Sequence, residues 1–257
     1  MTYIATISDA LLAARKARTP LAEFPGDLPT NLDDAYAIQL RSAGIYDSKI
    51  IGWKVGGVHP DMVEKWQATR MAGPAFEDAL KTCEDGDTIV MPIYPGGFAA
   101  VEAEYVAVLG DVPDRDVTLD DMDDVVTALH IGVEVASSPM KEINNIGPAA
   151  IVPDFGNNAG VIVGPQIDKN ADLTAHDVSV TIDGVLAGKK PTGAGDKGPY
   201  GAVVFLINHL RAQGIVIPAG TVISTGAVTG VHSADDGSRS HVVFEDFGEF
   251  YVELKAQ

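Results

Sequence analysis

Three glutamates, Glu102, Glu104 and Glu134, lie in stretches of the sequence that are otherwise apolar. Residues 99–110 have the composition of a β-strand, and because side chains alternate along a strand, Glu102 and Glu104 point to the same face. Residues 130–136 form a second apolar stretch, which carries Glu134. Buried carboxylates that lie side by side repel one another and lose hydration, so they require a cation or a shared proton.

Carboxylates that converge on one point form a site of hard oxygen ligands. Such a site suits Mg²⁺ or Mn²⁺, with waters or substrate atoms in the open positions. The other interpretation is an edge strand whose glutamates face water, which is the ordinary environment of this residue type. The residues alone leave both interpretations open.

Lys54 is the next residue that indicates chemistry, because it lies between apolar residues and glycines in GWKVG, residues 52–56. A lysine in such a strand extends its ammonium group to water or meets an anion. Beside a carboxylate–metal cluster, Lys54 would bind a substrate carboxylate or move a proton, with its pKa tuned by burial. The plainer interpretation is an ion pair with a nearby acid.

The elements that must position these residues change in type along the chain. Apolar spacing and capping signals predict helices over residues 1–18, 31–42, 59–72 and 119–129, and another from Pro199 to Gly214. Strand patterns cover residues 50–57, 87–91, 99–109, 130–136, 159–163, 178–187, 221–225 and 240–254, with a hairpin turn at Asp183-Gly184.

Strands outnumber helices without strict β-α-β alternation, which predicts a mixed, mostly antiparallel α+β fold. We expect residues 1–257 to form a single domain, in which an N-terminal helical arm (residues 1–72) precedes a β-rich body (residues 73–257). The stretch from Gly193 to Gly198 matches a dinucleotide-binding glycine pattern. It follows a hairpin rather than a β-α-β strand, so we expect a loop over a pocket mouth instead.

Composition narrows the class of protein. The chain has 36 acidic and 18 basic residues, a formal net charge of −18, which disfavours nucleic acid and anionic membrane as partners. The single cysteine, Cys83, excludes an intrachain disulfide and a zinc knuckle. The first residues lack the basic and apolar regions of a signal peptide, so we expect a cytoplasmic protein. A small anionic substrate would need local positive charge to overcome this field.

Seven motifs in sequence order carry a family resemblance. They are DAYAIQ (34–39), GWKVG (52–56), VEAE (101–104), GVE (132–134), DFGNNAGVIVG (154–164), VFLINHL (204–210) and AGTVISTG (219–226). From about residue 30 to its end, the chain resembles the 2-keto-4-pentenoate hydratase / 2-oxo-hexenedioate decarboxylase family, which has the fumarylacetoacetate hydrolase fold.

The resemblance implies that Glu102, Glu104 and Glu134 hold Mg²⁺ or Mn²⁺ and that the substrate is a small 2-oxo acid. The metal would polarise the keto group and stabilise an enolate. Lys54 matches the family's catalytic-pocket lysine. The remaining matches imply substrate-binding roles in two segments, at Asp154 and Asn158 and at Thr225 and Gly226. The family also implies a homo-oligomer, for which the apolar N-terminal helix is a candidate contact.

Three positions depart from the family pattern. Hydratases of this kind often carry an acid just before Gly73, where residues 70–72 here read RMA, and serine where this chain has Pro153 and Ala227. The leading hypothesis is a metal-dependent lyase of aromatic-compound catabolism, most like a 2-keto-4-pentenoate hydratase. The alternatives are a 2-oxo-hexenedioate (4-oxalocrotonate-type) decarboxylase, an acylpyruvate C–C hydrolase and a non-catalytic 2-oxo-acid-binding protein.

Overall fold

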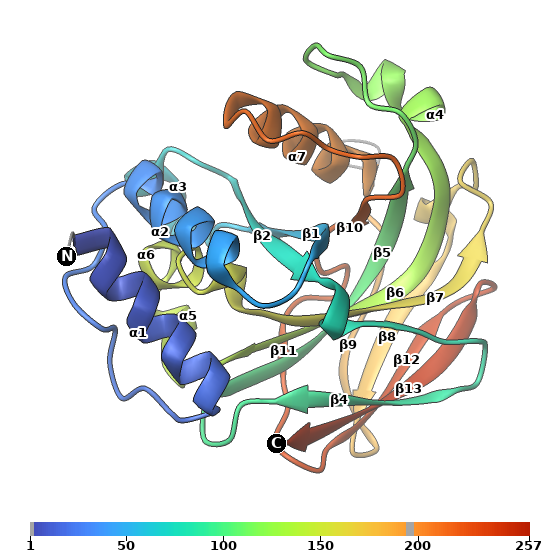
Figure 1. The fold of residues 1–257 in the computed structure, drawn as a ribbon. Coiled ribbons are helices and arrows are strands. Elements are labelled where there is room, and N and C mark those ends of the chain that lie inside the picture. The colour runs from blue at the N-terminus through green and yellow to red at the C-terminus, as the bar shows by residue number, and fades with distance from the viewer. Residues whose placement is uncertain (1–2, 194–197) are drawn as a thin grey trace.

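The structure, a computed structural model, describes residues 3–193 and 198–257, and all the strands of these residues belong to two sheets (Figure 1). The larger sheet has the order β2 (Arg70–Phe76), β1 (Ile50–Gly57), β10 (Val222–Ser224), β5 (Phe98–Leu109), β6 (Val126–Ser138), β7 (Asn158–Ile167), β3 (Leu80–Thr82), and β11 (His232–Ser233) also pairs with β5. The smaller sheet has the order β4 (Thr88–Ile93), β13 (Gly248–Ala256), β12 (Arg239–Phe244), β8 (Asp177–Ile182), β9 (Val185–Pro191).

The helices are short apart from three. They are α1 (Tyr3–Ala17), α2 (Leu32–Ile45), α3 (Pro60–Trp66), α4 (Met122–Val125), α5 (Ile143–Ile146), α6 (Pro148–Ile151) and α7 (Tyr200–Ala212). Single 3₁₀ turns cover Glu77–Ala79, Leu119–Asp121, Phe155–Asn157 and Leu173–Ala175. Among the described residues, no helix is both long and apolar enough to cross a membrane.

The mixed, mostly antiparallel α+β fold predicted from the sequence is confirmed. Only β1–β10, β3–β7 and β4–β13 are parallel among the strand pairs of the described residues. Asp183-Gly184 forms the predicted hairpin turn between β8 and β9. The division at residue 72 stays a prediction; β1 and β2, on either side of α3, both belong to the larger sheet.

Two predicted helices are much shorter than expected. Residues 59–72 were predicted to be helical, but α3 ends at Trp66, Gln67 has a left-handed φ of 50°, and β2 begins at Arg70. Thr118 does cap the turn that follows it, yet the chain becomes strand at Val126 rather than helix up to residue 129. Long-range pairing of β2 with β1 and of β6 with β5 outweighs the local helical pattern.

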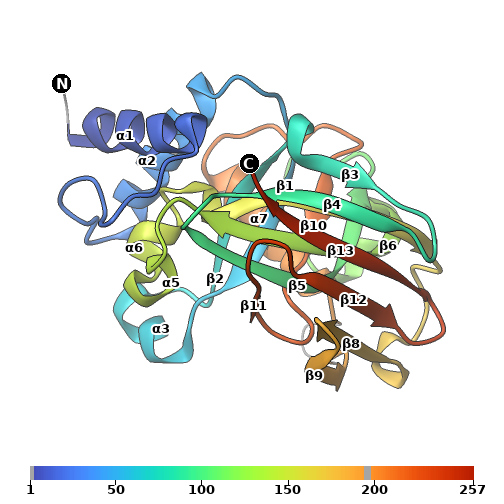
Figure 2. The ribbon, with the colours of Figure 1, turned by 90° about the horizontal axis from the view of Figure 1, so that it is seen from below.

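The main core lies where the two sheets and α7 meet. Tyr105 of β5 packs edge-on against Phe244 of β12, with ring centroids 5.3 Å apart, and both are fully buried. Leu206 and Leu210 of α7 join the same cluster. Figure 2, seen from below, shows the strands of the smaller sheet side by side.

The N-terminal helices take part in a second core, which also includes Met71 of β2. Ile7 and Leu11 of α1 pack with Ile38 of α2 and with residues around α5 and α6, such as Ile143 and Val152. This places α1 against the segment that leads into β7. The glycine-rich loop expected over a pocket mouth includes residues 194–197, which lie outside the described part of the chain.

Candidate metal centre

The strands β5 and β6 place the three glutamates together. In their antiparallel register Glu102 lies directly opposite Glu134, and Glu104 lies opposite Gly132. Each of the three side chains offers an oxygen within 4.8 Å of the others, and all three are buried. This separation fits coordination of one ion. Because the three side chains are buried and β5 and β6 lie inside the larger sheet, the interpretation as exposed glutamates of an edge strand does not apply.

Burial dominates the electrostatics of the cluster. Desolvation, with a further contribution from the charge of Glu134, raises the pKa of Glu102 to about 7. The same two causes raise the pKa of Glu104 well above its ordinary value, and desolvation raises that of Glu134. It is therefore unfavourable for all three carboxylates to be ionised at once unless a cation compensates their charge.

Lys54 reaches the cluster from β1. Its Nζ lies 3.2 Å from Glu134 Oε2 and donates a hydrogen bond of 3.4 Å to Asn157 Oδ1. Burial alone would lower the pKa of Lys54, but the three carboxylates outweigh it and the pKa is raised. Lys54 therefore carries a positive charge at neutral pH, in an interior position.

Glu104 is oriented from one side only. Its Oε2 accepts hydrogen bonds from Ser224 Oγ at 2.5 Å and from the backbone N–H of Gly226 at 2.8 Å. Its Oε1 is buried and has no hydrogen-bond partner among the described residues. A buried carboxylate oxygen without a partner is unfavourable, and a divalent cation would satisfy it, so the residues present fit such an ion.

A cavity of about 400 Å³ borders this cluster. Lys54, Glu102 and Asn157 provide polar groups of its wall, and Met71 and Ile151 are among its apolar residues. Of the described residues that line it, Lys54 is the sole lysine or arginine and Glu102 the sole acid. The arrangement can hold an anion next to a metal ion while apolar side chains surround the rest of a small molecule.

The other predicted substrate-binding residues take different places. Asn158 Nδ2 donates to Glu134 Oε1 at 3.0 Å, so it orients one of the candidate ligands. Thr225 Oγ1 donates to the backbone oxygen of Tyr105, and Thr225 and Gly226 line a separate cavity of about 300 Å³. These contacts leave their roles toward a substrate as predictions.

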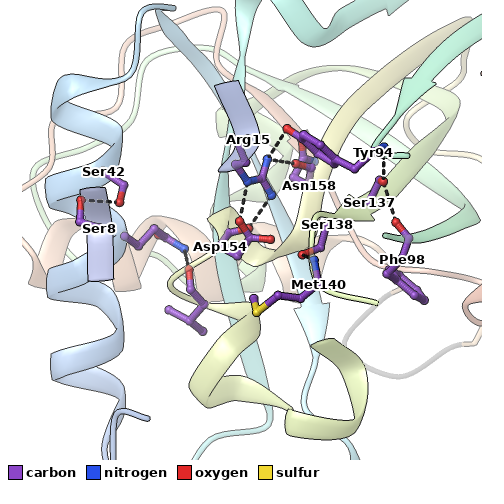
Figure 3. A network of polar contacts seen from close by, with 12 residues as sticks. Ser8, Arg15, Ser42, Tyr94, Phe98, Ser137, Ser138, Met140, Asp154 and Asn158 are labelled. Atoms are coloured by element: carbon purple, nitrogen blue, oxygen red, sulfur yellow. Dashed lines mark hydrogen bonds and ion pairs between the residues drawn. The ribbon is translucent and has the colours of Figure 1, made fainter. Parts of the chain in front are cut away.

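Asp154 is not brought into the lining of the cavity beside the glutamates. Asp154 is 1% exposed, and its carboxylate accepts a hydrogen bond of 2.5 Å from Arg15 Nε (Figure 3). Sequence reasoning missed Arg15, Ser224 and Asn157. Ser224 lay within the predicted strand beside Thr225, but its register against β5 was not available from the sequence.

Comparison with known proteins agrees with this geometry. The sequence profile described as fumarylacetoacetate (FAA) hydrolase C-terminal matches residues 60–255. The chain belongs to the fumarylacetoacetate hydrolase family. A curated relative, 2-keto-4-pentenoate hydratase of Paraburkholderia phymatum, is 26% identical over 228 residues, 84% of this chain and 82% of that protein.

Two solved structures superpose on the chain. A 4-oxalocrotonate decarboxylase from Pseudomonas putida G7, complexed with magnesium and adipate, gives a TM-score of 0.79 at 21% identity, covering 98% of this chain and 97% of that one. A fumarylpyruvate hydrolase from Pseudomonas aeruginosa, with Mn²⁺ and pyruvate, gives 0.60 at 16% identity, covering 83% and 94%. At these identities the likeness establishes the fold.

Proposed function

We propose that the chain is a divalent-metal-dependent lyase that acts on a small 2-oxo acid, most like a 2-keto-4-pentenoate hydratase. The observation that carries this proposal is the buried trio Glu102, Glu104 and Glu134 with Lys54 beside it. A buried carboxylate cluster that reaches a largely apolar cavity through Glu102, with the ammonium group of Lys54 beside it, suits a metal ion and an anionic substrate. The curated hydratase relative supports the same assignment.

Glu102, Glu104 and Glu134 would hold the ion, which we propose to be Mg²⁺ or Mn²⁺ because all three ligands are hard oxygens. When bound, a divalent ion acts as a Lewis acid that polarises a keto oxygen and stabilises negative charge developing on it. Related folds have been solved with magnesium, calcium and manganese, which supports a divalent ion without selecting one.

In this proposal, side chains of the chain bind the substrate and donate a proton to it. The Lys54 ammonium group, fixed by Glu134 and Asn157, presents a positive charge to a substrate carboxylate and holds a proton at Nζ that can be donated. The apolar wall, including Met71 and Ile151, excludes water from the distal part of the substrate. Asn158 keeps Glu134 turned toward the cluster.

Two features of the cavity bear on the choice between hydration and decarboxylation. Met71 lines it in the segment where hydratases often carry an acid, and this favours a reaction without a second acid, such as decarboxylation of 2-oxo-hexenedioate. A dicarboxylate, however, would place its second charge against a described wall whose sole lysine or arginine is Lys54. The second feature favours a monocarboxylate with an apolar tail, as in the hydratase proposal.

Assays of both substrate types with Mg²⁺ test the proposal. We expect the chain to hydrate a vinylpyruvate-type dienol faster than it decarboxylates 2-oxo-hexenedioate, and Glu104→Gln to abolish turnover. Glutamine keeps an oxygen for Ser224 and Gly226 while removing the ligand charge. Full activity of Glu104→Gln would contradict the metal mechanism. In wild type, faster decarboxylation would favour the decarboxylase. Release of pyruvate from acylpyruvates by wild type would favour the hydrolase. Binding without turnover would indicate a non-catalytic protein.

We also propose a homo-oligomer that acts in the cytoplasm. The family resemblance supports the assembly. The single cysteine, Cys83, is buried and free, which is compatible with a reducing compartment such as the cytoplasm. Sedimentation velocity at several concentrations tests the assembly. A species of one chain at every concentration would contradict it.

A further inference from the structure

The segment that leads from α6 into the first residue of β7 places two amide side chains at the metal centre. Asn157 accepts the hydrogen bond from Lys54 Nζ, and Asn158 donates to Glu134. Neither residue has to touch a metal ion to influence it, because each fixes a charged group that faces the cluster. The position of this backbone therefore sets the position of two members of the proposed active site.

That backbone adopts an unusual conformation. Phe155, Gly156 and Asn157 follow one another with φ values of 57°, 67° and 55°, all in the left-handed region. Glycine tolerates this region, whereas phenylalanine and asparagine do so at a cost in conformational energy. Such a run of residues persists only when the surrounding structure holds it in place.

Arg15 of α1 provides a direct hold. Its Nη2 donates to the backbone oxygen of Asp154 at 2.8 Å, and its Nη1 donates to the backbone oxygen of Asn158 at 3.0 Å. The guanidinium group thus connects the residue before the left-handed run to the residue after it (Figure 3). Nε also binds the Asp154 carboxylate, and Arg15 itself is 6% exposed.

We propose that Arg15 is a positioning residue for the metal centre, which holds residues 154–158 in the conformation that places Asn157 on Lys54 and Asn158 on Glu134. Its catalytic meaning depends on the proposed function, but the bracing itself does not. A planar guanidinium group suits the task because its donors have fixed directions and reach several acceptors at once. Helix α1, although outside both sheets, then contributes to the active site through this one side chain.

Hydrogen exchange of the metal-free protein tests the bracing. In Arg15→Met, the peptide covering residues 150–160, with the hydrogen-bonded amides of Asp154 and Asn157, should exchange at least about tenfold faster, because bracing is what keeps local opening rare. Peptides of β12 and β13 should be unchanged. Calorimetric titration should give an Mn²⁺ affinity lower by about tenfold, the range expected when the support of a ligand is lost.

Arg41→Met is the matched control, because Arg41 joins α2 to Asp9 and Ser8 of α1 through a partly exposed contact. It should leave both the exchange of residues 150–160 and the Mn²⁺ affinity unchanged. Arg15→Lys keeps the charge with fewer fixed donors and should show smaller effects in the same direction. It also serves as the test if Arg15→Met does not fold.

The proposal would be overturned if the Arg15 variants matched wild type in both hydrogen exchange and Mn²⁺ affinity. Equal changes in Arg41→Met would do so too, because they would show only loosened helix packing. Absence of Mn²⁺ binding by wild type would contradict the proposed function, while the exchange measurement would still decide whether Arg15 braces the segment.

Discussion

At the scale of single residues, Asn158 supports the candidate metal ligand Glu134 and is not itself one of the three proposed ligands. It is buried, and its amide group keeps one oxygen of Glu134 in place. Asn158→Ala should weaken Mn²⁺ binding by about 10–100-fold, the usual effect of losing such a partner. Titration calorimetry measures this, and Asn170→Ala, at an exposed position, is the control. An unchanged affinity in Asn158→Ala would show that Glu134 needs no such support.

The raised carboxyl pKa values give the site a characteristic pH dependence. The pKa of Glu102 is about 7 in the folded chain, against an ordinary value of 4.5. The folded state therefore binds the proton more tightly, so this contribution to stability is present below about 4.5 and is lost as pH rises through about 7. A metal ion would replace the lost protons and reverse the loss.

The increase in Tm on adding Mg²⁺ should thus be larger near pH 8 than near pH 6, because protons and the ion compete for the same carboxylates. Differential scanning fluorimetry with and without Mg²⁺ measures it. Glu104→Gln should remove most of the Mg²⁺ effect at both pH values. An increase that is the same at pH 6 and pH 8 would indicate that the ion binds elsewhere.

At the scale of elements, close backbone approaches set the geometry of the site. Gly73 of β2 pairs with Lys54 of β1, and a Cβ at Gly73 would lie 2.2 Å from the backbone oxygen of Phe155. A Cβ at Gly156 would meet Lys54 Cδ at 3.2 Å. The glycine at position 73 therefore lets residues 155–157 lie directly against the strand that carries the lysine.

Gly73→Ala should lower the free energy of unfolding by about 1–3 kcal/mol or more, because the neighbour is backbone and has little freedom to move. Urea denaturation measures the change. Gly44→Ala is the control, since a Cβ there meets nothing within 4 Å and alanine favours the α2 helix. Equal stability of Gly73→Ala and wild type would mean that the segment is not tightly packed against β2.

The sequence predicted the local part of this arrangement better than the long-range part. Alternation along residues 99–109 was enough to place Glu102 and Glu104 on one face. The pairing of Glu102 with Glu134 depends on the register of β5 against β6, which no local pattern specifies. Arg15 meets Asp154 across 139 residues of chain, so its role became visible only in the folded structure.

Long-range strand pairing also explains why the helix predicted over residues 119–129 was wrong. Thr118 caps a turn, because its hydroxyl accepts a hydrogen bond from the backbone N–H of Asp120. The helix does not continue because Val126 and Leu129, which are fully buried, lie in a strand between β5 and β7. Interior burial of apolar side chains in a sheet outweighs a modest helical preference.

At the scale of the whole molecule, the net charge of −18 and the charge of the site act in opposite directions. The acids of residues 111–124 form exposed contacts such as the Arg115–Asp121 ion pair, so they contribute mainly to the long-range field. That field repels an anionic substrate, whereas Lys54 and a bound cation attract it at short range.

Salt should therefore assist the proposed enzyme. At saturating Mg²⁺, kcat/KM for the anionic substrate should rise as NaCl increases from about 20 to about 200 mM, because salt screens the distant charges more than those within the cavity. Steady-state kinetics with KCl as a second salt checks that the effect is general. A steep fall in kcat/KM with salt would show that the long-range field attracts the substrate instead.

The proposed function requires that Glu102, Glu104 and Glu134 bind one divalent ion in the folded chain. An anomalous difference map from crystals grown with Mn²⁺ and oxalate tests it most directly. We predict a single strong peak, with an oxygen of each glutamate at about 2.0–2.4 Å, the range of hard divalent ions. No peak among these carboxylates at saturating Mn²⁺, or a strong peak only elsewhere, would contradict it.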